Sequence, residues 1–333
     1  MKNLIKKLVE TVGPSGYEGQ IREVIKAEAK KYSKDITVDA LGNLIVRVGK
    51  KTGNGRRIMV SGHMDEIGII ATHIDKKGFI RFALVGGVGA RFMPGSRVKF
   101  LDGTLGTIQS EPPESVEKVS PLTKLFVDVG AVDDVSCPVK VGDMAVFDRP
   151  MFDCGQRLIS KAMDNRISCA VMLGALEKIK NPANELVFVF STQEEVGTRG
   201  ATTAAYHIDP DIGLAVDVTG VGDTPSARPM EVSLGKGPAI KLKDGGMISD
   251  TRIVEWMRST AKAAKLPYQL EILEGGTTDA RAMQMARAGV PAGCLSIPTR
   301  YIHSPSEMVD IDDVENAVEL LSLLCTKPVS VEV

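Results

Sequence analysis

The sequence lacks the cysteine pattern, the long apolar run and the cleavage site that mark disulfide-rich, membrane and secreted proteins. Its five cysteines are an odd number without Cys-x-x-Cys spacing, which argues against a disulfide framework or a structural zinc knuckle and favours a reducing compartment. No apolar run approaches the roughly 20 residues that a membrane helix needs. The amphipathic, lysine-containing segment 2–12 is followed by no small-residue cleavage site, so we expect a surface helix and a cytoplasmic protein.

Net charge and aromatic content are also low. The formal net charge of -1 provides no broad field for nucleic acid or an anionic membrane, so we expect neither as a partner. One Trp and 5% aromatic residues offer little material for the stacking platforms of a sugar cleft. Hydrophobic residues at 43% and charged residues at 25% indicate a globular protein. A length of 333 residues exceeds the common size of one domain, so we expect two.

The pattern of elements changes twice along the chain. Residues 1–67 and 160–333 alternate between helical and strand-like segments, which is typical of an α/β domain. Between them, 68–159 shows short strands separated by Gly-, Pro- and Asp-containing turns and predicts an inserted β-rich domain. Helices are expected at 2–12, 18–32, 164–180, 249–265, 278–288 and 311–325, and strands of the α/β domain at 35–40, 44–48, 57–62, 186–190, 212–218, 269–273 and 294–297.

Two polar residues stand at the ends of predicted apolar strands. His63 directly follows strand 57–62, at the edge where open α/β sheets bind ligands. Asp65, two residues on, could orient the second ring nitrogen of His63. Asp217 lies in the apolar run 212–218, where an ionised carboxylate is costly without a partner such as a metal ion. An ordinary polar loop at His63 and a turn opening at Asp217 are the structural alternatives.

Two adjacent carboxylates, Glu194 and Glu195, follow a third apolar strand. Neighbouring side chains point apart in non-helical backbone, so one could bind a metal ion while the other addresses a bound water. A capping box is the alternative, because Ser191 stands three residues before Glu194. We expect no regular helix at this point, because Gly197 and Gly200 leave little room for one.

Asp164 and His303 are less informative when each is taken alone. Asp164 stands at the start of the helix expected at 164–180 and would otherwise serve as its N-cap. His303 follows the strand at 294–297 and would otherwise be an ordinary loop histidine. The chain has only four histidines, and two of them fall on the same pattern of strand ends.

Together these stretches resemble the tetrahedral, or glutamyl-type, aminopeptidase family. The similarity is carried by GHMDE at 62–66, KAMDNR at 161–166, QEEVG at 193–197, VDVT at 216–219, GGTTDA at 275–280 and IPTRYIHSPSE at 297–307. The resemblance implies a three-layer α/β catalytic domain with a mixed sheet, formed by 1–67 and 160–333. It also implies that 68–159 is an inserted PDZ-like or barrel-like domain for dimerisation.

The resemblance also implies a role for each site residue. Asp164 would bridge two divalent metal ions, one completed by His63 and Asp217 and the other by Glu195 and His303; Asp65 would orient His63, Glu194 would be the general base, and the peptide after Asp164 would be cis. Three ligand carboxylates cancel three of the four charges of two dications, and a bridging hydroxide would neutralise the rest. Histidine and carboxylate ligands suit zinc, cobalt or manganese.

The expected function is a metal-dependent aminopeptidase acting on peptides, with dimers assembling into a dodecamer and an open preference for acidic, neutral or basic N-terminal residues. The first alternative is an endoglucanase-type glycoside hydrolase with Glu194 and Glu195 as acid and base. Glycosidase carboxyls flank the scissile bond about 5 to 9.5 Å apart, a mechanism that gives two histidines no role. The second alternative, a non-catalytic metal-binding assembly protein, fits poorly with a full set of ligands and base.

Overall fold

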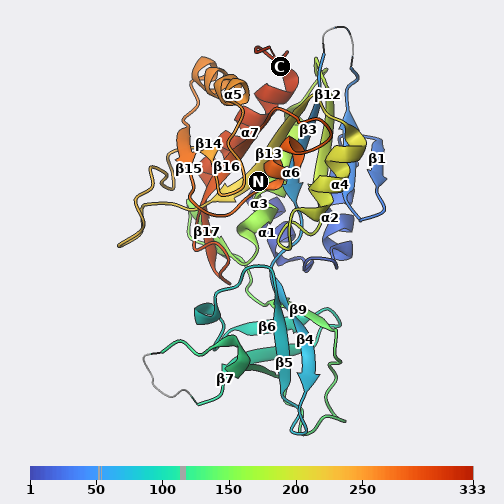
Figure 1. Cartoon of the computed structure of the whole chain (residues 1–333), viewed down its shortest axis with the longest axis vertical. Coiled ribbons are helices and arrows are strands. Elements are labelled where there is room, and N and C mark those ends of the chain that lie inside the picture. Colours follow the sequence, from blue (N-terminus) through green and yellow to red (C-terminus); the bar gives the residue numbers. More distant parts are fainter. Residues whose placement is uncertain (52, 54, 113–117, 333) are drawn as a thin grey trace.

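The computed structural model describes residues 1–51, 53, 55–112 and 118–332, and Figure 1 shows an α/β lobe above a β-barrel. The strands of the lobe are β1 (Asp35–Val38), β2 (Leu44–Val48), β3 (Arg57–His63), β10 (Phe152–Asp153), β11 (Arg157–Ser160), β12 (Glu185–Ser191), β13 (Ile212–Thr219), β14 (Ala239–Lys243), β15 (Gln269–Ile272), β16 (Ala292–Arg300) and β17 (Glu307–Asp310). They form one mixed sheet in the order β1-β2-β12-β3-β13-β16-β17-β11-β10, with β14 and β15 attached at β16.

Helices cover both faces of this sheet. They are α1 (Lys2–Glu10), α2 (Gly19–Ala29), α3 (Met163–Lys178), α4 (Arg199–Ile208), α5 (Thr251–Ala264), α6 (Asp279–Gln284) and α7 (Ile311–Thr326). Side chains alternate across the central strand β3: Ile58 and Val60 pack with α1, α2, α3, α5 and α7, whereas Met59 packs with α4 and α6. This period of two builds the three layers that the family resemblance implied. Among the described helices, none has both the length and the apolar character to cross a membrane.

The inserted domain is a closed antiparallel barrel. Its strands are β4 (Gly68–Ile74), β5 (Ile80–Val85), β6 (Arg97–Phe100), β7 (Leu105–Ser110), β8 (Leu125–Asp128) and β9 (Met144–Phe147), with short 3-10 turns η1 (Ala90–Phe92) and η2 (Leu122–Lys124). They close in the order β4-β5-β8-β7-β6-β9. Inward side chains such as Val98, Ile108 and Val127 fill a core separate from those of the lobe. The β-rich insert is therefore confirmed, and it takes the barrel form.

Strand pairing divides the chain differently from the predicted boundary at 159. The short strands β10 and β11 fall within the expected insert, yet β11 pairs with β17 and β10 pairs with β11. Residues 152–160 therefore extend the large sheet and not the barrel. The partner of β11 lies about 150 positions away in the sequence, so no local pattern could predict this pairing.

Helix α4 corrects a second prediction. The segment after Gly197 was expected to hold no regular helix, but α4 begins at Arg199 and contains Gly200. A side chain at Gly200 would lie 2.2 Å from the side-chain oxygen of Asn43 and 2.5 Å from the carbonyl of Thr192. This glycine therefore lets the first turn of α4 pack against the loop after β12, and it marks a close approach and not a helix break.

Candidate metal centre

The predicted site residues gather at the carboxyl edge of the parallel strands at the centre of the large sheet. β12 and β13 both pair in parallel with β3. His63 is the last residue of β3, Asp217 lies near the end of β13, and Glu194 and Glu195 follow β12. The strand ends therefore bring His63 together with residues more than 100 positions later in the sequence, as expected for an open α/β sheet.

Asp164 lies between the two histidines. Its Oδ1 is 3.1 Å from Nε2 of His63, and its Oδ2 is 3.4 Å from Nε2 of His303. Nε2 of His303 is also 3.2 Å from Oε2 of Glu195, and Nε2 of His63 is 3.9 Å from Oδ1 of Asp217. Two groups of three follow, each with ligand atoms within 4.8 Å of one another: His63, Asp164 and Asp217, and Asp164, Glu195 and His303.

The structural alternatives for Asp164 and Glu194 do not describe this geometry. Asp164 has a non-helical backbone, the residue before α3 is Ala162, and no side chain caps that helix. The peptide bond between Asp164 and Asn165 is cis. Thr198 precedes α4 without a side-chain cap. The hydroxyl of Ser191 donates to Asp279, so it forms no capping box with Glu194.

Asp65 contacts both His63 and the loop after β12, whereas the sequence indicated only a contact with His63. It lies beside His63, with Oδ1 3.3 Å from Nδ1 of that ring. Its carboxylate also accepts hydrogen bonds from the backbone N–H groups of Glu194 at 3.0 Å and Glu195 at 3.2 Å, and from the hydroxyl of Ser15 at 2.6 Å. One buried carboxylate thus fastens the loop that carries both glutamates.

Glu307 is a supporting residue that the sequence analysis missed. Its two carboxylate oxygens accept from the backbone N–H of Asp164 at 2.9 Å and of His303 at 2.8 Å. The side chain is buried and contacts both ends of the central constellation. Its position in the stretch 297–307 was the available signal, but nothing in the sequence indicated that it reaches Asp164.

The pKa shifts of the site residues favour the binding of cations. Burial alone would lower the pKa of His303, but Asp164 and Glu195 raise it to about 11. Burial raises the pKa of Glu195, and the charge of Asp164 adds to that effect. Burial likewise raises the pKa of Asp217 well above its usual range, although His63 opposes it. Carboxylates crowded in this way resist ionisation unless further positive charge is supplied.

A buried oxygen supports the same conclusion. Oε1 of Glu195 is shielded from solvent, and no described residue forms a hydrogen bond with it. Buried polar atoms are normally satisfied, so an exception calls for an explanation such as an ion. Together with two imidazoles and the shared carboxylate of Asp164, this atom makes the residues a suitable donor set for two divalent metal ions.

A pocket of about 290 Å³ opens onto this group. Its further walls include the apolar side chains of Val218, Leu273 and Ile302, together with Thr277. Thr277 lines the pocket, but Asp279, two residues further on, does not. The structure instead buries Asp279, whose carboxylate accepts from the hydroxyls of Ser61 at 2.7 Å and Ser191 at 2.5 Å and so joins the ends of β3 and β12.

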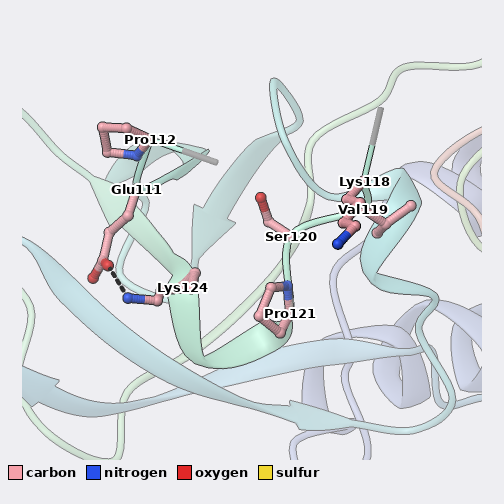
Figure 2. Close-up of a pocket in the computed structure, with 7 residues that line it drawn as sticks. All are labelled: Glu111, Pro112, Lys118, Val119, Ser120, Pro121 and Lys124. Atoms are coloured by element: carbon pink, nitrogen blue, oxygen red, sulfur yellow. Dashed lines mark ion pairs between the residues drawn. The ribbon is translucent and has the colours of Figure 1, made fainter. Parts of the chain in front are cut away.

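A second hollow lies on the barrel, away from these residues (Figure 2). It measures about 200 Å³. Glu111 on its rim forms an ion pair with Lys124 at 2.9 Å and a further pair with Arg81. The described residues that line the hollow include no histidine or cysteine, and we assign it no chemistry.

Comparison with known proteins agrees with the resemblance. Residues 42–320 match the profile of the M42 glutamyl aminopeptidases. The chain belongs to this family. A protein of Acetivibrio thermocellus that carries an aminopeptidase name is 47% identical over 323 residues, which cover 96% of this chain and 97% of that one. An aminopeptidase structure from Desulfurococcus kamchatkensis matches with a TM-score of 0.93 and 40% identity, covering 97% of this chain and 94% of that one.

Two further structures similar to this chain bear on assembly and on the rival function. A TET1 peptidase of Pyrococcus horikoshii, which can assemble into a tetrahedron or a large octahedral shell, is 32% identical with a TM-score of 0.89, covering 98% of this chain and 99% of that one. A Thermotoga maritima protein named an endoglucanase is also 32% identical, with a TM-score of 0.81 and 96% coverage of both chains. The family match and the similar aminopeptidases therefore support aminopeptidase function for this chain.

Proposed function

We propose that this M42 family member is a metal-dependent aminopeptidase that hydrolyses N-terminal residues from peptides with Glu194 as the general base. The observation that carries the proposal is the carboxylate of Asp164, shared between two groups of three potential ligands. Glu194 belongs to neither group, yet its Oε2 lies 3.8 Å from Nε2 of His63. It is thus beside the centre without being needed to hold an ion.

In this proposal the donor set divides into two metal sites that share Asp164. His63 and Asp217 would hold one ion and Glu195 and His303 the other, with Asp164 binding both. When bound, the two ions polarise the scissile carbonyl and acidify the attacking water. Histidine and carboxylate donors suit zinc or cobalt, and also manganese.

Glu194 would move the proton. Burial, opposed by His63 and reinforced by the charge of Asp217, raises the pKa of its carboxyl well above the usual range. A carboxylate with a raised pKa is a better proton acceptor near neutral pH, so Glu194 can take a proton from the attacking water and pass it to the leaving amine. The hydrogen bond from its N–H to Asp65 holds the backbone of this base in place.

The test is peptidase activity with and without a chelator. We expect the purified protein to bind two divalent ions per chain, one for each ligand group, and to cleave aminoacyl p-nitroanilides only when they are present. The leucyl substrate should be cleaved faster than the lysyl or glutamyl one, because Val218, Leu273 and Ile302 provide apolar walls. Metal content and initial rates are measured on the same samples.

Each rival function gives a different result in this assay. Hydrolysis of a soluble cellulose derivative that survives chelation would support the glycosidase and contradict our proposal. Uptake of both ions without cleavage of any aminoacyl substrate or peptide would indicate a non-catalytic metal-binding protein.

We also propose that the insert, predicted over 68–159, joins subunits into dimers and larger assemblies. The barrel exposes apolar side chains, Val132 at 80% and Val135 at 90% of their surface, and clustered exposed apolar residues often mark protein contacts. The similar Pyrococcus horikoshii peptidase supports the proposal, because it forms closed shells.

Sedimentation velocity should therefore find a species many times larger than the 35.7 kDa chain. The double substitution Val132→Asp and Val135→Asp should shift the protein to smaller species, because it places charges on the proposed contact. Val38→Asp on β1 is the matched control, since Val38 is also exposed, at 41%, but lies on the α/β lobe. A wild-type protein that stays monomeric at micromolar concentration would overturn the assembly proposal and leave the metal chemistry untouched.

A further inference from the structure

A loop of the barrel reaches the metal-ligand residues. It follows β5 and contains Gly86 and Gly87. A side-chain carbon at Gly87 would lie 2.9 Å from Nδ1 and 3.1 Å from Cε1 of His303. One at Gly86 would lie 3.2 Å from both Cβ and Oε2 of Glu195. The described residues of the insert contribute no ligand, yet this loop lies beside two ligand residues of the same group.

This loop is anchored on its other side. Ile67 and Val88, which flank the two glycines in the structure, are buried in the apolar core of the barrel. The Cγ2 atom of Ile67 lies 2.8 Å from the position that a side-chain carbon would take at Gly86. Because protein cores are close-packed, the loop cannot retreat from the site without disturbing the barrel.

The two histidines of the centre are oriented by different means. Nδ1 of His63 has a partner in Asp65, whose carbonyl oxygen is 3.2 Å away. Ligand histidines usually have such a partner for the second ring nitrogen. No residue in the described parts of the chain forms a hydrogen bond with Nδ1 of His303, and the Nδ1–Cε1 edge of this ring faces Gly87, where there is no room for a side chain. The His303 side chain is 40% exposed, and its ring is otherwise held through Nε2, which lies beside Asp164 and Glu195.

We propose that Gly86 and Gly87 are positioning residues, which set the His303 ring and the Glu195 carboxylate for metal binding, so that the insert acts on the catalytic centre as well as on assembly. The inference rests on the proposed function of the centre. A methyl group at Gly87 would have to move from 2.9 Å to an ordinary contact distance, which displaces the ring or the loop by about half an ångström. Metal–nitrogen bonds of about 2.0 to 2.1 Å tolerate only about 0.2 Å.

The chain provides matched controls for both glycines. Gly86 has φ +82 and Gly95, also in the insert, has φ +81, but a side chain at Gly95 would meet nothing within 4 Å. The two alanine variants therefore share the same backbone strain and differ in what the added methyl meets, which at Gly86 is Ile67 at 2.8 Å and Glu195 at 3.2 Å. Gly89 has φ -73, and its side chain would face Phe92 at 3.3 Å, so Gly89→Ala controls for a methyl added elsewhere in the loop.

The experiment is a cobalt titration of the metal-free full-length protein. Calorimetry measures the affinity at each step, and visible absorption gives the spectrum of the bound ion. Wild type, Gly89→Ala and Gly95→Ala should bind two equivalents with the same affinities and spectra. Gly86→Ala and Gly87→Ala should bind one equivalent as wild type does and the other at least tenfold more weakly, with an altered spectrum. Far-UV circular dichroism confirms that each variant is folded.

The outcomes separate this inference from the proposed function. A wild-type protein that binds no cobalt overturns the proposed centre. If wild type binds two equivalents and both glycine variants match it in affinity and spectrum, the positioning role alone is wrong. If these variants do not fold, hydrogen exchange of the wild type decides: cobalt should slow exchange in residues 86–89 as well as around His303, and unchanged exchange in 86–89 contradicts the inference.

Discussion

Replacement of Glu194 by glutamine should leave both metal ions bound and lower kcat by about 10² to 10⁴-fold, the usual contribution of a general base. Glutamine keeps the size of the side chain but cannot accept the proton. Glu194 lies outside both ligand groups, so the substitution removes no donor from either. Steady-state rates on leucyl p-nitroanilide and metal content by mass spectrometry measure the two effects on one sample.

Glu195→Gln is the matched control, because it makes the same change one residue along the same loop. Oε2 of Glu195 lies 3.2 Å from His303 and Glu195 is part of a ligand group, so this variant should bind one ion more weakly. Loss of metal from Glu194→Gln, or full activity in that variant, would show that the roles assigned to the two glutamates are wrong.

The apolar pattern of the sequence was sufficient to predict the central strands. The run 212–218 corresponds to β13, which is buried along its whole length, and the strand expected at 57–62 corresponds to β3. A strand between two helical layers must be apolar on both faces, so its signal is local and strong. A polar residue at the end of such a run, such as His63 or Asp217, is then a good guide to the functional edge of the sheet.

Features that depend on distant partners could not be predicted in the same way. β11 belongs to the large sheet because it pairs with β17, and Arg157 of β11 forms an ion pair with Asp310. Taken alone, the sequences of β11 and β17 are too short to predict a strand of the large sheet. The sequence places them in different regions, and only the folded sheet brings them together.

The same limit applies to the supporting residues of the site. Glu307 holds the backbone of Asp164, which is 143 residues earlier in the chain. Gly87, on the inserted barrel, leaves the space that a side chain would take beside His303. A ligand can be recognised by its chemistry and by its position at a strand end, but a residue that orients a ligand through packing or a backbone hydrogen bond has no chemical signature of its own.

A buried ion pair lies next to the pocket, and removing only one of its partners should lower the stability of the protein. Lys241 of β14 and Glu271 of β15 form a salt bridge in which both side chains are fully buried. Burial alone would lower the pKa of Lys241, but the charge of Glu271 raises it, so the lysine is charged at neutral pH. The same carboxylate accepts a hydrogen bond from the hydroxyl of Thr219 at 2.7 Å, and Thr219 lines the pocket.

Lys241→Met should therefore lower the free energy of unfolding by about 3 to 5 kcal/mol, because it leaves the carboxylate of Glu271 buried without a counter-charge. The second oxygen of Glu271 already has no hydrogen-bond partner among the described residues, so no neighbour can take over the role of the lysine. Thermal unfolding at constant protein and metal concentration measures the loss as a lower Tm.

The double variant Lys241→Met and Glu271→Gln separates the charge effect from packing. Glutamine is neutral and still offers an oxygen to the hydroxyl of Thr219, so most of the lost stability should return and the pocket wall should keep its hydrogen bond. If the double variant melts no higher than Lys241→Met, the cost does not come from an uncompensated charge. Because neither residue belongs to the ligand groups, both variants should bind metal as wild type does, which distinguishes a loss of stability from damage to the centre.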